Sequence, residues 1–215
     1  MTILTFAKQS VLYFFVLTLL QTFYSCHSTS TNHREPVSVP TAKTRVVLQP
    51  FSDYKKQDAI VLSRKLKNLG LETEVAEPLA LPSFAWRSSR ARYRADSLIR
   101  YLSGRTPSGD VTIGLTHYDV STTKGGNEDW GVMGLGYMPG KACVVSTFRI
   151  RGKNKEEKYA KVVIHEFGHT RGLGHCPIKT CLMRDAEGKD HLDEEKGFCN
   201  ECTDELKKAG YSLYK

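Results

Sequence analysis

One stretch decides how this chain is interpreted: His165-Glu166-Phe167-Gly168-His169-Thr170-Arg171-Gly172-Leu173-Gly174-His175. On an α-helix, His165 and His169 lie one turn apart on the same face, so both imidazoles can bind one ion. Gly172 can adopt a backbone conformation closed to other residues, which would end the helix and return the chain with His175 as a third ligand. Three imidazoles leave one position of a tetrahedral Zn²⁺ open for water, the catalytic pattern. Glu166, beside the first ligand, can act as general base toward that zinc-bound water.

For the first five residues alone, a helix that merely carries two surface histidines would be a serious alternative. Gly172 and His175 stand at the further spacings that a third ligand requires. The full pattern therefore predicts a catalytic zinc site.

The composition is that of a soluble globular protein, with 25% charged and 40% hydrophobic residues in a chain of 215. The net charge is +8. Much of this excess lies in an arginine-rich stretch interleaved with Trp86 and Tyr93, namely Arg87, Arg90, Arg92, Arg94, Arg100 and Arg105. No nucleic-acid-binding motif accompanies these charges, so a solvated helix face is the favoured interpretation and no nucleic-acid partner is predicted.

The N-terminus indicates export. Residues 1–25 carry Lys8 and then the apolar run Val11 to Leu20. This run is shorter than a transmembrane helix normally requires and has the length of the apolar core of a signal peptide. The run closes on Ser25-Cys26, which resembles a bacterial lipobox and predicts lipidation of Cys26. Residues 26–43 are polar and are predicted to form a flexible tether. We therefore expect a lipoprotein of the cell envelope held to the membrane by its anchor; a secreted or periplasmic protein and a retained N-terminal anchor helix are the alternatives.

The remaining chain, 44–215, is predicted to form a single α/β domain. Strands are expected at 45–51, 71–75, 110–116 and 142–150, and helices at 54–69 and 90–102. A loop is expected at 119–130, followed by a glycine-rich strand at 131–137 on a sheet edge, where an extended peptide could add as one more strand. Asn154 and Glu157 are expected to cap the helix that carries the histidines.

Cysteines follow the histidine stretch in two close pairs, Cys176 with Cys181 and Cys199 with Cys202. Two such pairs separated by a short connection suit a four-cysteine zinc site, although an oxidising compartment would also allow disulfides. Cys143 lies in an apolar run and is expected to be a small buried residue.

From His165 to Cys202, with Cys181-Leu182-Met183 between, the sequence resembles the archaemetzincins. The resemblance implies a metzincin-type α/β fold with a mixed twisted sheet, an active-site helix and a C-terminal zinc-bound subregion. It also implies a zinc-dependent peptidase with two Zn²⁺ ions. His165, His169 and His175 would bind the catalytic ion, Met183 would form the Met-turn beneath it, and the four cysteines would bind the structural ion.

Two functions follow as expectations. The leading one is a zinc metallopeptidase that hydrolyses peptide or protein substrates with Glu166 as general base. The alternative is a zinc-stabilised peptide- or partner-binding module at the cell surface with little hydrolysis, motivated by the lack of a recognisable pro-segment. The sequence indicates no oligomeric state, no substrate preference and no choice between endo- and aminopeptidase action.

Overall fold

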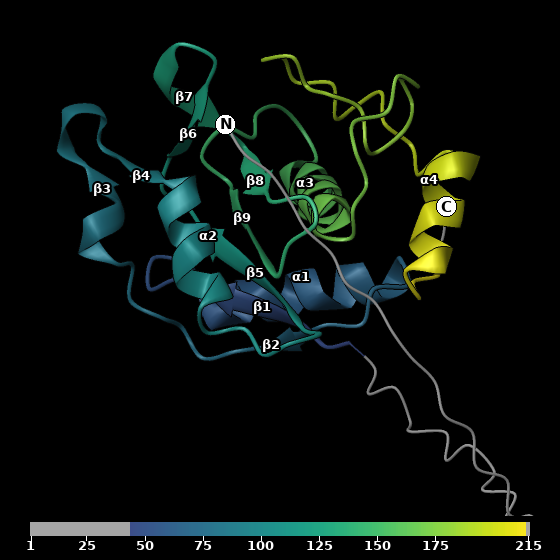
Figure 1. The fold of residues 1–215 in the computed structure, drawn as a ribbon, viewed down its shortest axis with the longest axis horizontal. Coiled ribbons are helices and arrows are strands. Elements are labelled where there is room, and N and C mark those ends of the chain that lie inside the picture. The colour runs from purple at the N-terminus through teal and green to yellow at the C-terminus, as the bar shows by residue number, and fades with distance from the viewer. Residues whose placement is uncertain (1–43, 214–215) are drawn as a thin grey trace, which may run out of the picture. The chain divides into compact units, whose positions relative to one another are not determined.

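The computed structural model describes residues 44–213 (Figure 1). The predicted signal peptide (1–25), the lipidation site Cys26 and the tether (26–43) lie outside these residues and stay predictions. Within the described range, none of the helices has the length and apolar content that a membrane-spanning segment needs.

The central sheet has five strands in the order β2-β1-β5-β9-β8. Their bounds are β1 (Val46–Pro50), β2 (Glu74–Val75), β5 (Val111–Thr116), β8 (Gly134–Gly136) and β9 (Ala142–Ser146). The first four strands of that order pair in parallel, whereas β8 pairs antiparallel with β9. The sheet is therefore mixed, as predicted, and β8 lies at its edge.

Helices cover both faces of this sheet (Figure 1). They are α1 (Lys56–Asn68), α2 (Ala95–Ser103) and α3 (Lys155–Thr170). The last helix, α4 (Asn200–Lys208), lies to one side of the sheet near the C-terminus (Figure 1). In β9, Cys143 and Val145 pack with α1 and α3, while Ala142 and Val144 pack with α2. Because both faces of this strand are covered, it is apolar throughout, and Cys143 is a buried small residue as predicted.

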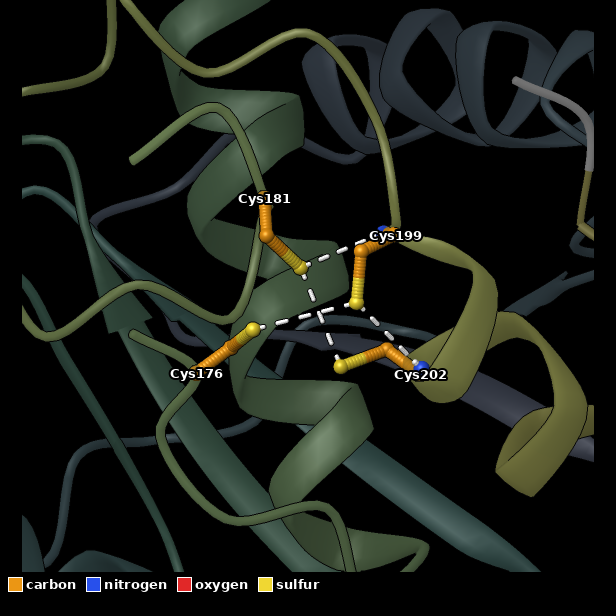
Figure 2. A group of neighbouring side chains, drawn as sticks. All are labelled: Cys176, Cys181, Cys199 and Cys202. Carbon is orange, nitrogen blue, oxygen red and sulfur yellow. Dashed lines mark hydrogen bonds between the residues drawn. The ribbon is translucent and has the colours of Figure 1, made fainter. Parts of the chain in front are cut away.

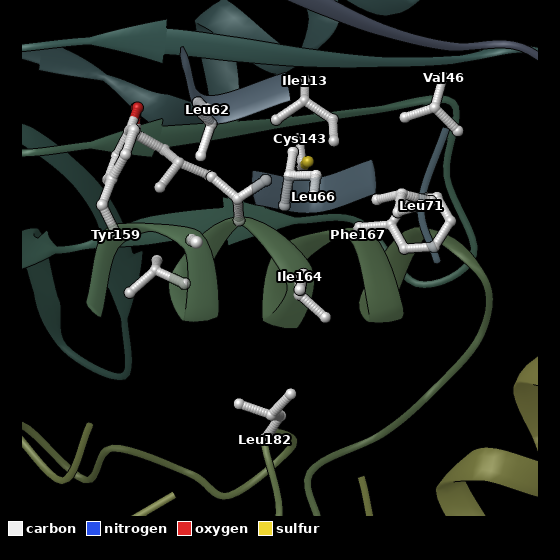
Figure 3. Packing of buried hydrophobic residues seen from close by; sticks show 14 of the residues in the cluster. Val46, Leu62, Leu66, Leu71, Ile113, Cys143, Tyr159, Ile164, Phe167 and Leu182 are labelled. Atoms are coloured by element: carbon white, nitrogen blue, oxygen red, sulfur yellow. The ribbon is translucent and has the colours of Figure 1, made fainter. Parts of the chain in front are cut away.

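The histidine-bearing helix α3 packs on two sides. Tyr159 and Phe167 point toward the sheet, and Ile164 points toward Leu182 in the segment that follows the helix (Figure 3). All four side chains are at most 7% exposed. This two-sided burial fixes the helix against both the sheet and the C-terminal segment.

A second, four-stranded sheet has the order β3-β4-β6-β7. It contains β3 (Trp86–Arg87), β4 (Arg92–Arg94), β6 (Val120–Lys124) and β7 (Asn127–Val132), with short 3₁₀ helices η1 (Ser83–Ala85) and η2 (Ser88–Arg90) beside it. The predicted loop at 119–130 is wrong, because β6 and β7 form a hairpin. Gly125 and Gly126 make its two-residue turn, and its polar strands are largely exposed, which hid the strand pattern.

Other predicted boundaries are also corrected. The helix predicted at 90–102 begins only at Ala95, because Arg92–Arg94 pairs with β6. The glycine-rich strand predicted at 131–137 is divided between β7 and the edge strand β8. The strand predicted at 142–150 ends at Ser146, whose Oγ accepts a hydrogen bond from the N–H of Phe148.

The N-terminus of α3 has the predicted position and a different cap. Asn154 directly precedes the helix but has φ 55°, and its side chain makes no capping hydrogen bond. The backbone N–H of Glu157 donates instead to the carbonyl oxygen of Asn154. The expected side-chain cap is therefore wrong, because the left-handed backbone of Asn154 replaces the extended conformation that such a cap uses.

Candidate metal centres

The end of α3 returns the chain toward its own histidines. After Thr170, Gly172 adopts φ 94°, and the N–H of Leu173 donates to the carbonyl oxygen of Gly168. A left-handed glycine at this place is the usual way for a helix to stop and the chain to reverse. The predicted helix end and return are confirmed.

The reversal brings three imidazoles together. The ring centroids of His165 and His169 are 4.6 Å apart, and His175 lies 5.6 and 4.9 Å from them. One nitrogen of each ring lies within 4.8 Å of the others, so a single ion can reach all three. Burial lowers the pKa of His165 to about 4 and also lowers that of His169, which keeps both rings in the neutral form that binds metals.

Two of the imidazoles are oriented by backbone carbonyls. Nδ1 of His165 lies 2.6 Å from the carbonyl oxygen of Leu182, and Nδ1 of His169 lies 2.7 Å from that of Leu173. A ring that donates through Nδ1 leaves Nε2 as the free lone pair, which is the arrangement typical of metal-binding histidines.

The third imidazole is held by a carboxylate. Nδ1 of His175 lies 3.3 Å from Oδ2 of Asp185, and the His175 ring is about half exposed. Asp185 was not predicted from the sequence, because it lies in a loop and no periodicity marks it as a partner of His175. Asp185 thus completes the set of acceptors that orient the three rings.

Glu166 lies buried in the same region and is only 7% exposed. Burial raises the pKa of its carboxyl to about 8, although a backbone hydrogen bond from Gly136 acts in the opposite direction. A Cβ on Gly134 would lie 2.7 Å from Glu166 Oε1, and one on Gly136 would lie 2.7 Å from the Glu166 carbonyl oxygen. The glycines of β8 therefore permit the close approach of α3 to this strand.

Met183 lies directly beneath the histidine helix and is fully buried. A Cβ on Gly168, between the two helical histidines, would lie 2.6 Å from Met183 Sδ. Gly168 therefore leaves the space that Met183 occupies. Met183 therefore packs against α3 between the two helical histidines, and its role as a Met-turn stays a prediction.

The four cysteines form a second cluster, with their sulfurs turned toward one another (Figure 2). The Sγ atoms of Cys176 and Cys199 are 3.8 Å apart, as are those of Cys181 and Cys202. A tetrahedron with zinc–sulfur bonds of about 2.3 Å has edges of about 3.8 Å, so the donor set fits a zinc ion. All four are free thiols, and the two separations of 3.8 Å do not join the sequence neighbours that the disulfide alternative would pair.

The cysteine cluster is connected to the histidine cluster through the backbone. The N–H of Cys176 donates to the carbonyl oxygen of Met183 at 2.7 Å, and Cys176 directly follows His175. Cys199 forms the N-cap of α4, where its Sγ accepts from the N–H of Cys202. A metal at the cysteines would therefore hold both the return of the chain and the Met183 turn.

A cleft of about 650 Å³ opens over the histidines. One wall comes from the hairpin and β8 (122–124 and 130–136), and the other from 184–190 with Leu192 and Glu195. Val162, His165, Glu166 and His169 of α3 line it between these walls. The candidate ligands and the candidate base thus share one accessible cleft.

Comparison with known proteins agrees with this site. The profile of peptidase family M54 matches residues 90–208, more than half of the chain. Curated archaemetzincins from Halobacterium salinarum and Haloquadratum walsbyi are 30% and 32% identical, over 74% and 73% of this chain and 96% of each relative. The chain belongs to the archaemetzincin family. It is a zinc metallopeptidase, and the alternative of a binding module without hydrolysis is not favoured.

Solved archaemetzincins have the same fold. The crystal structure of the Methanopyrus kandleri protein superimposes with a TM-score of 0.66 at 28% identity, covering 79% of this chain and 97% of that chain. The Archaeoglobus fulgidus protein, crystallised as a complex with malonate, gives a TM-score of 0.62 at 28% identity, covering 75% and 99%. The predicted metzincin-type α/β architecture is confirmed.

Proposed function

We propose that this archaemetzincin hydrolyses peptide bonds with Glu166 as general base and with His165, His169 and His175 as the ligands of the catalytic zinc. The observation that carries the proposal is the convergence of three imidazoles, each held through Nδ1, in the cleft that also contains Glu166. When bound there, zinc would act as a Lewis acid toward water and the scissile carbonyl.

Glu166 supplies the proton transfers in this proposal. Its carboxylate accepts a proton from the attacking water and then donates that proton to the nitrogen of the leaving amine. Burial raises the pKa of this carboxyl, so its ionised form is a stronger base than that of an ordinary glutamate. Gly134 and Gly136 leave room for this side chain against β8.

The edge strand β8 supports an extended substrate. It pairs with β9 on one side and is the last strand of the sheet, and residues 130–136 line the cleft. A peptide laid along this edge would continue the antiparallel pairing and pass over the histidines. We therefore infer that the substrate is a peptide or protein segment in extended conformation.

A second zinc at Cys176, Cys181, Cys199 and Cys202 is part of the proposal. It rests on the sulfur separations of 3.8 Å and on the hydrogen bond from the N–H of Cys176 to Met183. Its role would be structural, because four protein sulfurs leave no position for substrate.

The decisive test is Glu166→Gln, which keeps the side-chain shape and removes the base. We expect it to bind zinc like the wild type and to lose hydrolysis of a peptide library by at least about 100-fold. Products are identified by mass, with and without a chelator. Cleavage by Glu166→Gln at the wild-type rate would show that the base is assigned wrongly.

We also propose that the protein is exported and anchored through a lipid on Cys26. The apolar run Val11 to Leu20 and the Ser25-Cys26 junction support this proposal. In cells of a bacterial host, Cys26→Ser should abolish metabolic labelling with palmitate and move the protein from the membrane to the soluble fraction. Equal labelling of the two chains would refute the lipid anchor.

A further inference from the structure

A second buried acid lies in the cleft apart from Glu166. Glu195 is 6% exposed and lines the wall opposite the edge strand, together with Leu192. It shares the cleft with Val162 of α3, which stands one helical turn, about 5–6 Å, before Glu166. Glu195 is therefore placed to meet a part of a substrate that occupies this cleft.

The carboxylate of Glu195 has no partner among residues 44–213, where no hydrogen bond or ion pair reaches its oxygens. Three charges on this wall are engaged in pairs, Arg184 with Glu194, Asp185 with His175 and Asp190 with Lys158. The other two, Glu187 and Lys189, are exposed and form no ion pair among the described residues. Lys161 also approaches, but its Nζ donates to the backbone carbonyl oxygens of Leu192 and Glu195. Glu195 is thus the one buried acid of this wall that is left without a cation.

The side chain is nevertheless accessible from the cleft. In the described part of the chain, the side-chain oxygens that are both fully enclosed and without a hydrogen-bond partner belong to Asp53, Ser121, Asp129 and Tyr211. The oxygens of Glu195 are not among them, so its unpaired carboxylate is not fully enclosed. Burial raises the pKa of Glu195 to about 7, and the charges of Lys161 and Arg184 offset this only in part. An unpaired buried carboxylate gains most from a cation delivered to it, because pairing removes its desolvation cost.

We propose that Glu195 forms a specificity subsite that selects a cationic group of the peptide substrate. The group is an ammonium or guanidinium, supplied either by a lysine or arginine side chain near the scissile bond or by the α-amine of the peptide. Leu192 and Val162 would contact the apolar stem that carries the charge. This inference rests on the proposed peptidase function and names the substrate class that this function selects.

The test compares peptides that differ only in one charge. Lysine, arginine or the uncharged norleucine is placed at each of three positions on either side of one cleavable bond, with free and acetylated N-termini. We expect the wild type to favour the cationic peptide by roughly 10- to 100-fold in kcat/KM, the range for one charge-assisted hydrogen bond. Glu195→Gln should lower this preference to about one. A preference tied to one position identifies a side chain, and a preference lost on acetylation identifies the α-amine.

Glu205→Gln is the matched control. It removes the same charge from an exposed residue of α4 that lies outside the cleft lining, so the preference for cationic peptides should persist. If it vanishes in both variants, general electrostatic attraction explains the preference and the subsite is refuted. Equal kcat/KM for lysine and norleucine peptides at every position, with no effect of acetylation, also refutes it.

Binding to the Glu166→Gln variant separates this inference from the peptidase mechanism. Calorimetry should show tighter binding of the cationic peptide in that background, and the difference should disappear in Glu166→Gln/Glu195→Gln. If the wild type cleaves nothing while the binding difference remains, the subsite holds and the hydrolytic proposal fails. If cleavage occurs and neither binding nor kcat/KM discriminates, the hydrolytic proposal holds and the subsite fails.

Discussion

At the scale of single residues, the ring of His175 is oriented by a carboxylate, whereas the rings of His165 and His169 are oriented by backbone carbonyls. Asp185→Asn would keep the shape of the side chain and weaken the acceptor for His175 Nδ1. We expect zinc affinity at the histidines to fall about 10- to 100-fold, as for other such partners of metal ligands. Competition with a chelator measures this, and Asp204→Asn, an exposed acid on α4, is the control. Unchanged affinity in Asp185→Asn would show that the contact orients nothing.

Glu195 also makes stability depend on pH. The ordinary pKa of a glutamate is 4.5, and burial raises that of Glu195 to about 7 in the folded protein. Between these values the folded state holds a proton that the unfolded state has released, so stability falls as the pH rises through this window. Glu195→Gln should match the wild type at pH 4 and exceed it at pH 8 by on the order of 1–2 kcal/mol, after allowance for screening by water. Denaturant unfolding at both pH values measures it; a gain that is the same at pH 4 and pH 8 would contradict it.

At the scale of elements, the glycines of the edge strand β8 allow it to lie in close contact with α3. A Cβ on Gly134 would lie 2.6 Å from Glu166 Cγ, so Gly134→Ala must displace that side chain. Because a misplacement of about 1 Å can cost about 100-fold in rate, we expect kcat to fall 10- to 100-fold while zinc stays bound. Gly126→Ala, in the open turn of the hairpin, has nothing within 4 Å of its new Cβ and should keep wild-type kcat. Similar kcat values for the two variants would mean that Glu166 tolerates the shift.

At the scale of the whole molecule, the cysteine cluster connects the C-terminal helix to the active-site helix through residues 176–199. We expect two zinc ions per chain in the wild type and one in Cys199→Ser. The melting temperature of Cys199→Ser should be lower than that of the wild type by more than about 5 °C, because metal binding stabilises the folded state. Cys143→Ala removes a buried thiol outside the cluster and should keep both ions. Elemental analysis and thermal unfolding check this. One zinc per wild-type chain, with no free thiols after denaturation, would indicate disulfides instead.

The sequence by itself determined the parts whose signal is local. His165 and His169 are joined by helical periodicity, Gly172 marks the reversal, and the spacing to His175 follows from both. The parallel pair β1 and β2 follows from the helix predicted between two short strands. The buried strands β5 and β9 follow from their apolar runs, because a strand covered on both faces has no polar side. The four cysteines were grouped by spacing alone, and their sulfurs do converge.

Only the tertiary structure decided the rest, because the remaining signals depend on contacts between distant segments. The strands β6 and β7 of the hairpin are mostly polar and, apart from Val120 and Ser121, partly or fully exposed, so no periodicity marks them. Asp185 becomes a partner of His175, and Glu195 becomes a buried acid, only once loops without repeating pattern fold against α3. A spacing along the chain specifies which residues can share an ion; the packing of loops specifies which charges are left facing a substrate.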